Sequence, residues 1–104
     1  MLDAARKAER VLDGIDDVGG AANRIANGHA WAKHAAEFPD VASVGQFESL
    51  VLDVMENASE AKELVGGRRA FWSEGTLVIF DPASIDGGTV FRPRDGFAYY
   101  EGLS

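Results

Sequence analysis

The chain has 104 residues, contains no cysteine and carries 17 acidic against 10 basic side chains, a formal charge of −7. This length fits one compact domain with a single hydrophobic core. The absence of cysteine excludes disulfides, thiolate metal sites and a cysteine nucleophile. The apolar runs are far shorter than the ~20 residues of a membrane span. We therefore expect one soluble domain, residues 1–104, without a membrane span.

The acidic balance argues against generic binding to nucleic acid, because domains that bind phosphates usually carry an excess of Lys and Arg. Its distribution is uneven, however. Residues 1–65 hold six basic and twelve acidic side chains, whereas residues 66–104 hold four arginines, no lysine and five acids. The acidic excess therefore belongs to the first part of the chain, and the second part is close to neutral.

The first part of the chain predicts helices. Apolar residues at helical spacing predict a helix over residues 2–18, which Gly19-Gly20 interrupts before a short helical stretch over residues 21–25. Another helix is expected over residues 29–38, ending before Pro39, with Trp31 and Phe38 on its buried side.

The helix that follows has the strongest sequence signal. Ser43 as N-cap and Gln46 three residues later form a capping box. Apolar residues then recur at steps of three and four from Phe47 to Ala61, which predicts one face buried along its whole length.

The second part of the chain predicts a sheet. Four short runs of β-type residues, separated by turn residues, cover residues 68–72, 76–80, 89–92 and 97–100. Connections this short join antiparallel neighbours. The expected fold class is α+β, with two or three N-terminal helices packed on a four-stranded antiparallel sheet.

Both histidines of the chain lie on the helix predicted over residues 29–38. His29 and Lys33 share a helix face, and His34 is rotated by roughly 100° from Lys33. A histidine can exchange a proton near neutral pH and a lysine can stabilise a developing anion, so the three could form an acid–base site. The alternative is that His29 and Lys33 are solvated surface and His34 borders the core. Two histidines at an offset of five do not share a face as zinc-binding pairs do, so no metal site is assigned.

A second group of candidate residues lies on the late strands. Thr89 and Arg92 offer a hydroxyl and a guanidinium that suit a phosphodiester. Strict alternation places them on opposite faces of a strand, so they could share a site only if Pro93 marks a bulge or turn. Tyr99 and Tyr100 could stack on a base, or one of them could belong to the core.

Several short motifs, taken as an ordered set, resemble the C-terminal toxin domains of bacterial polymorphic and contact-dependent growth-inhibition systems. Those domains are RNases of the barnase/EndoU/colicin/RelE superfamily, and the likeness is to the colicin D-like tRNases in particular. The motifs, which span residues 28–104, are His29-Ala-Trp-Ala-Lys-His34, Glu37-Phe38, Gly67-Arg68, Asp81-Pro82, Gly88-Thr-Val-Phe-Arg-Pro93 and Tyr99-Tyr100.

The resemblance implies an endoribonuclease toxin that cleaves tRNA. The 2′-hydroxyl would attack the phosphate to leave a 2′,3′-cyclic phosphate, and no metal or other cofactor would be needed. His34 or His29 would act as general base or acid, and Lys33 with Arg92 would stabilise the pentacoordinate phosphate. Thr89 would donate a hydrogen bond to the phosphate, and Tyr99 would position the nucleotide. Further residues expected to bind substrate are Arg68, Arg69, Arg94 and Tyr100.

The resemblance also implies partners and a location. Residues 28–104 would form the nuclease core, and residues 1–27 would be either a junction or linker helix or part of the catalytic fold. The domain would be secreted at the end of a larger effector, act in the cytoplasm of the target cell and be neutralised by a cognate immunity protein that covers its cleft. Whether a host activator is needed stays open.

Two alternatives to the nuclease follow from the same sequence. The acidic charge favours a non-catalytic partner-binding or immunity-like module. A toxin that transfers a nucleotidyl or ADP-ribosyl group would keep the fold and leave RNA strands uncut.

Overall fold

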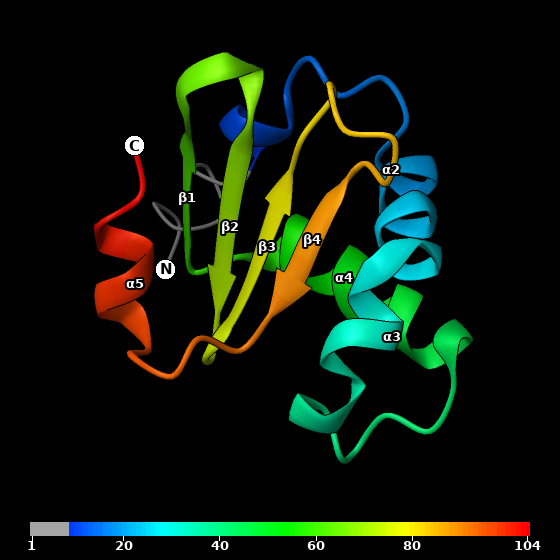
Figure 1. The fold of residues 1–104 in the computed structure, drawn as a ribbon. Helices are drawn as coiled ribbons and strands as arrows, with labels where there is room; N and C mark the ends of the chain where they lie inside the picture. The colour runs from blue at the N-terminus through cyan, green and yellow to red at the C-terminus, as the bar shows by residue number, and fades with distance from the viewer. Residues whose placement is uncertain (1–8) are drawn as a thin grey trace.

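The computed structural model describes residues 9–104 and confirms the α+β class, with helices preceding a four-stranded antiparallel sheet (Figure 1). The strands follow one another in chain order, each paired with the next. Their bounds are β1 Glu60–Glu63, β2 Arg69–Ser73, β3 Thr76–Phe80 and β4 Gly88–Phe91. A short 3-10 turn, Val65–Gly67, links β1 to β2. The sheet is therefore a simple meander, as its short connections require.

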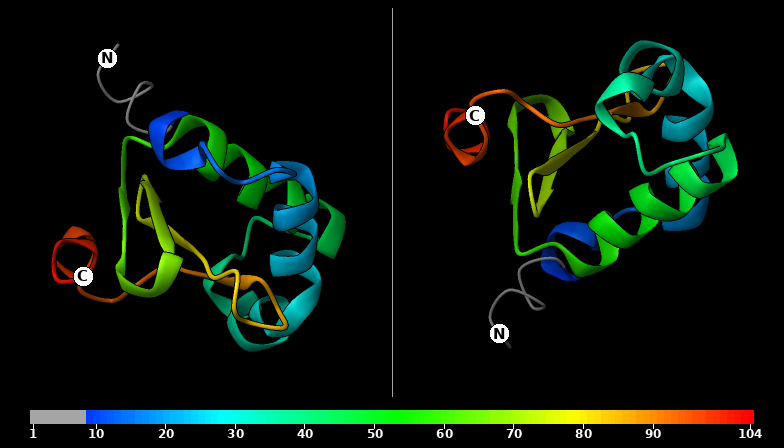
Figure 2. Two further views of the ribbon diagram at one scale, coloured as in Figure 1. Left: turned by 90° about the horizontal axis from the view of Figure 1, so that it is seen from above. Right: turned by 90° about the horizontal axis from the view of Figure 1, so that it is seen from below.

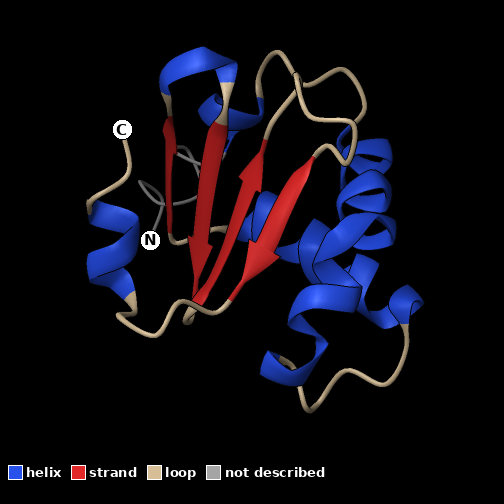
Figure 3. Cartoon of the chain, viewed as in Figure 1, coloured by secondary structure: helices blue, strands red, loops and turns tan. Residues whose placement is uncertain are grey.

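The helices cover one face of this sheet, and α5 covers part of the other (Figures 2 and 3). The larger helices are α2 Val18–Ile25 and α4 Val44–Asn57. Between them lie a wide turn, Ala26–Ala30, the short α3 Trp31–His34 and a 3-10 turn, Ala35–Glu37. The last helix is α5 Phe97–Glu101.

The helix predicted over residues 29–38 is present in segments and packs as expected. The chain kinks at Gly28, whose backbone angles are not helical. The last helical turn of the segment ends at Glu37, two residues before Pro39. Phe38 is fully buried and packs edge-on against Phe47 of α4, with 5.0 Å between ring centroids. Trp31 contacts the same Phe47 ring at 5.0 Å. This aromatic cluster fixes the end of the segment against α4.

Helix α4 begins as its capping box predicts. The Gln46 N–H donates to the Ser43 hydroxyl at 3.2 Å, and the Gln46 side chain accepts from the Ala42 N–H at 2.8 Å. The helix is shorter than predicted, however. It ends at Asn57, and Ala61 lies in β1, opposite Phe71 of β2. The helical spacing of apolar residues therefore continues past the end of α4 into β1, the first strand of the sheet.

Two further expectations about the elements are wrong. The run Phe97–Tyr100 forms α5 rather than a fourth strand, because Phe97 and Tyr100 both pack against Trp72 across the sheet face. Gly19-Gly20 does not interrupt a helix but lies in the first turn of α2, where the Asp17 side chain accepts from the Gly20 N–H. Of the helix expected over residues 2–18, residues 1–8 lie outside the described part, residues 9–12 are helical and Asp17 is the N-cap of α2.

Strand alternation divides the interior into two clusters. Toward α2 and α4, the sheet contributes Phe71, Val78 and Val90 to the main core. Toward α5, it contributes Ala70, Trp72 and Leu77 to a smaller cluster that Tyr100 completes. Because α5 is short, its cluster includes Ile79 and Phe91 only at its partly exposed border. The end of β4 therefore lies between the helical layer and α5, at the edge of both clusters.

Candidate functional site

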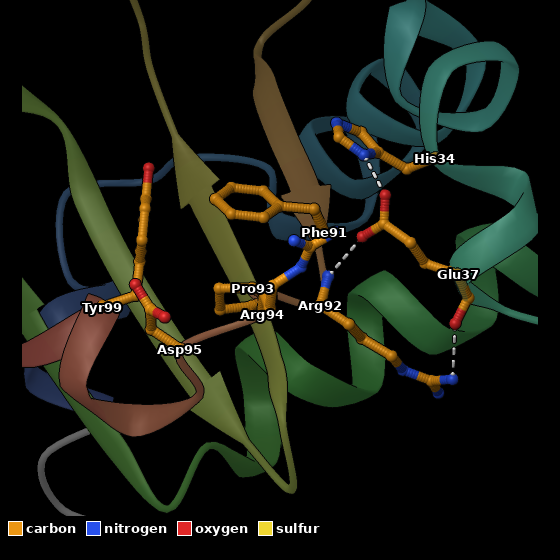
Figure 4. Close-up of a pocket in the computed structure, with 8 residues that line it drawn as sticks. All are labelled: His34, Glu37, Phe91, Arg92, Pro93, Arg94, Asp95 and Tyr99. Carbon is orange, nitrogen blue, oxygen red and sulfur yellow. Dashed lines mark hydrogen bonds and ion pairs between the residues drawn. The ribbon is translucent and has the colours of Figure 1, made fainter.

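A cleft of about 450 Å³ opens where the helical layer, the end of β4 and the start of α5 meet (Figure 4). Three structural units contribute to it: the turn that ends at Glu37, the segment that follows β4, and the exposed side of α5. The residues that line it are His34, Glu37, Phe91, Arg92, Pro93, Arg94, Asp95 and Tyr99. Segments far apart in the sequence thus bring a histidine, two carboxylates and two arginines together.

The centre of the cleft is a histidine–glutamate pair. His34 and Glu37 are three residues apart, so the tightening turn places them on the same side, and His34 Nδ1 hydrogen-bonds Glu37 Oε2. The other carboxylate oxygen accepts from the Arg92 main-chain N–H at 2.8 Å. A carboxylate has no proton to donate, so Nδ1 carries the proton and leaves the other ring nitrogen of a neutral His34 as an acceptor.

Glu37 is held in its ionised form. Burial raises the pKa of Glu37, but hydrogen bonds from the Arg92 N–H and from His34, with the positive charge of both side chains, outweigh it and place the pKa below the ordinary 4.5. The pair is thus an ionised carboxylate that orients the His34 ring. The same arrangement, in catalytic triads, fixes the tautomer of a general base and stabilises the imidazolium it becomes.

A row of three rings forms one wall of the cleft. The His34 ring stacks on Phe91 with centroids 5.5 Å apart and an interplanar angle of 26°. Phe91 in turn contacts Tyr99 edge-on at 5.3 Å. Tyr99 is 43% exposed, so its ring and hydroxyl are available to a ligand. Aromatic rings of this kind are the usual stacking partners of unpaired bases.

The two arginines of the cleft have different surroundings. The Arg92 guanidinium turns toward the helical layer, where Nη1 donates to the Glu37 main-chain oxygen at 2.9 Å and Nε donates to the Thr76 hydroxyl at 3.2 Å. Its plane lies over the Phe38 ring, with Cζ 4.4 Å from the centroid. Arg94 is exposed and is one of the residues that line the cleft (Figure 4). The cation best placed to meet a bound anion is therefore Arg94.

The other residues expected to be catalytic lie outside this cleft. His29 is 84% exposed and pairs with Asp86, in the turn before β4. Lys33 is exposed on α3 and does not line the cleft. Thr89 pairs with Ile79 on the face of the sheet opposite to Val90 and Arg92, as strict alternation predicts. Pro93 creates no bulge that would unite Thr89 and Arg92 in one site.

The remaining residues expected to bind substrate have structural contacts elsewhere. Arg68 donates to the main-chain oxygens of Val65 and Ser104. Arg69 is mostly buried, with Nη2 4.0 Å from a Glu63 carboxylate oxygen.

Tyr100 is 4% exposed in the cluster beneath α5, and burial raises its pKa to about 12. The Lys62 ammonium lies 4.6 Å from the centroid of its ring. Its hydroxyl therefore stays protonated near neutral pH, and its ring is covered.

The sequence analysis assigned no role in a site to four residues that line the cleft: Glu37, Phe91, Pro93 and Asp95. The signal for Glu37 was present, because a glutamate three residues after a histidine in a helical segment shares its face. Asp95 and Pro93 lie in a turn whose path the sequence does not reveal. Across residues 9–104, no group of three or more His, Asp or Glu side chains is arranged to hold a metal ion.

The chain was compared with models of protein families, with curated proteins and with solved structures, and none of the three comparisons found a match. Within residues 9–104, the helices are too short or too polar to cross a membrane. The fold and the cleft are therefore the basis for assigning a function.

Proposed function

We propose that this domain is an endoribonuclease toxin that cleaves RNA by attack of the 2′-hydroxyl on the adjacent phosphate. The observation that supports this most directly is the arrangement of His34. One ring nitrogen is held by the ionised Glu37, and the ring lines an open cleft that Arg94 and Tyr99 also line. A fixed proton acceptor that shares a cleft with a guanidinium and an exposed aromatic ring suits a phosphodiester that carries a base.

In the proposed reaction, His34 Nε2 takes the proton of the 2′-hydroxyl while the 2′-oxygen forms its bond to phosphorus. Glu37 stabilises the imidazolium that results. Arg94 stabilises the charge on the pentacoordinate phosphate. The bond from phosphorus to the 5′-oxygen breaks, and the Tyr99 hydroxyl protonates the leaving oxygen. The products are a 2′,3′-cyclic phosphate and a 5′-hydroxyl, and the nucleophile belongs to the RNA, so the scheme requires no metal.

The biological setting is proposed from the resemblance to colicin D-like toxins. We extend the proposal to tRNA as the substrate, to delivery at the end of a larger secreted protein, and to action in the target-cell cytoplasm. A cognate immunity protein would cover the cleft. The near-neutral charge of residues 66–104, set against the acidic helical part, supports an RNA contact that is confined to this end of the molecule.

The test is to incubate the purified domain with total RNA in the presence of a chelator and to analyse the fragment ends. We expect discrete fragments ending in 2′,3′-cyclic phosphates, whereas DNA stays intact. The substitution His34→Ala should lower the rate about 10²–10⁴-fold, the usual contribution of a general acid or base. His29→Ala is the matched control, since this exposed histidine has its own carboxylate partner outside the cleft.

RNA that remains intact at high protein concentration, both in buffer and in a cell lysate that supplies any host activator, would overturn the nuclease proposal. Equal loss of activity in the two histidine variants would overturn the assignment of the cleft. Because the acidic charge of the helical part also suits a partner-binding module, intact RNA would leave that function as the better explanation.

A further inference from the structure

A buried threonine lies behind the cleft. Among the described residues, Thr76 is the one polar, non-aromatic side chain in the interior, where it is 2% exposed. It begins β3, which pairs with β4, and its hydroxyl accepts a hydrogen bond at 3.2 Å from Nε of Arg92, the residue that follows β4. A buried hydroxyl destabilises a core unless it has a partner. This one is satisfied by a residue of the cleft.

Arg92 in turn holds Glu37 at two points. Its main-chain N–H donates to the carboxylate, and its guanidinium donates to the main-chain oxygen of the same residue. The guanidinium also lies over the Phe38 ring. Glu37 is thereby fixed relative to β4, even though it lies at the end of a 3-10 turn whose own hydrogen bonds are few.

We propose that Arg92 is a positioning residue, secured by Thr76, which holds the Glu37 carboxylate so that His34 keeps its proton on Nδ1 and presents Nε2 to the substrate. The catalytic part of this statement rests on the proposed function. The positioning part rests on the chain of contacts from Thr76 through Arg92 and Glu37 to His34. Arg92 thus acts through Glu37 and does not itself hold the phosphate.

The other ionisable groups near His34 do not replace this chain. Arg94 and Asp95 line the cleft from the segment after β4, Tyr99 lines it from α5, and Lys33 precedes His34 on α3. The contact made by Nδ1 is with Glu37, so the placement of this carboxylate decides which ring nitrogen carries the proton of the neutral ring.

The test compares Thr76→Val with Thr76→Ser. Valine has nearly the shape of threonine but cannot accept the hydrogen bond from Arg92, whereas serine keeps the hydroxyl. Arg92→Gln removes the guanidinium directly. All three are made in a His29→Ala background, which leaves His34 as the single histidine of the chain. The tautomer of His34 is then read from the nitrogen chemical shifts of its ring by NMR, at a pH where the ring is neutral.

We expect the Nδ1–H tautomer in the parent protein and in Thr76→Ser. In Thr76→Val and Arg92→Gln the population should move toward the Nε2–H tautomer, which a histidine in water favours. Cleavage of RNA should follow the tautomer, with kcat falling by up to about 100-fold and KM nearly unchanged, because a misplaced group slows the chemical step.

A tautomer that is the same in Thr76→Val, Arg92→Gln and the parent would overturn the proposal. A rise in KM at constant kcat in Arg92→Gln would also overturn it, because Arg92 would then bind substrate directly. Backbone amide spectra of the same samples report folding, so that a tautomer shift caused by unfolding is recognised. The Thr76 pair decides the question if Arg92→Gln does not fold. If the tautomer shifts as expected but neither the parent protein nor any variant cuts RNA, the positioning role stands and the nuclease proposal is overturned.

Discussion

The Glu37 carboxylate should stabilise the fold in a pH-dependent way. In Glu37→Gln the shape is kept, but a group that accepts two hydrogen bonds is replaced by an amide with one accepting oxygen. Hydrogen bonds to charged groups contribute about 1.5–3 kcal/mol each, and the Glu37 side chain is 34% exposed, which weakens them. We therefore expect the free energy of unfolding near neutral pH to fall by about 1–2 kcal/mol.

The direction of the pH dependence follows from the lowered pKa of Glu37. The unfolded chain has the ordinary value of 4.5, so the ionised carboxylate stabilises the folded state above that pH. This stabilisation disappears as the pH falls through the lower pKa of the folded state. The difference between parent and variant should therefore shrink in acid.

Urea unfolding of both proteins, at about pH 7 and about pH 3, measures this difference. The exposed carboxylate of Glu56 on α4 supplies the control, because Glu56→Gln should change stability by less than about 0.5 kcal/mol at either pH. A Glu37→Gln difference that is equal at both pH values would refute the reasoning, since it would show that the charge of Glu37 does not contribute.

Three further substitutions test the packing that supports the cleft. Phe47→Ala should destabilise the domain by about 3–5 kcal/mol in urea unfolding, because it empties the fully buried position between Trp31 and Phe38; a loss below about 1 kcal/mol would contradict this packing. Gly88→Ala should prevent folding, as judged by circular dichroism, since its new Cβ would lie 1.9 Å from the Ile79 main-chain oxygen, whereas Gly75→Ala meets no atom within 4 Å and should lose only about 1–2 kcal/mol from its positive φ. Ser43→Ala should lower the unfolding free energy by about 1 kcal/mol through loss of the N-cap of α4, and Ser43→Asp should restore it.

The sequence predicted best those elements whose formation is decided locally. The capping box marked the start of α4, and glycine-rich turns marked β2, β3 and β4. The first strand was missed because Glu60–Glu63 has little β-propensity and takes its conformation from pairing with β2. The run Phe97–Tyr100 was predicted as a strand because aromatic residues favour strands in general. It forms a short helix instead, and the rings of Phe97 and Tyr100 pack on Trp72.

The lining of the candidate cleft was predicted in part, for a similar reason. His34, Arg92, Arg94 and Tyr99 were recognised by residue type, and the cleft brings them together. Helix geometry gives the angle between His29 and His34, but it does not show which of them faces β4, because the kink at Gly28 changes the direction of the segment that carries both. The Arg92 guanidinium faces the helical layer, whereas Arg94 is exposed in the cleft. This difference depends on how the chain turns at Pro93, which the spacing of the residues does not show.

The position of β1 in the sheet explains why its sequence looks so unlike a strand. The sheet order places β1 at one edge and β4 at the other, and the turn Ala26–Ala30 contacts β4. An edge strand offers its main chain to other molecules, and charged side chains discourage pairing between copies. Three of the four residues of β1 are charged, and the strand is short. The charged side chains that made this strand hard to recognise in the sequence thus also disfavour edge-to-edge pairing of sheets, and hence aggregation, at high protein concentration.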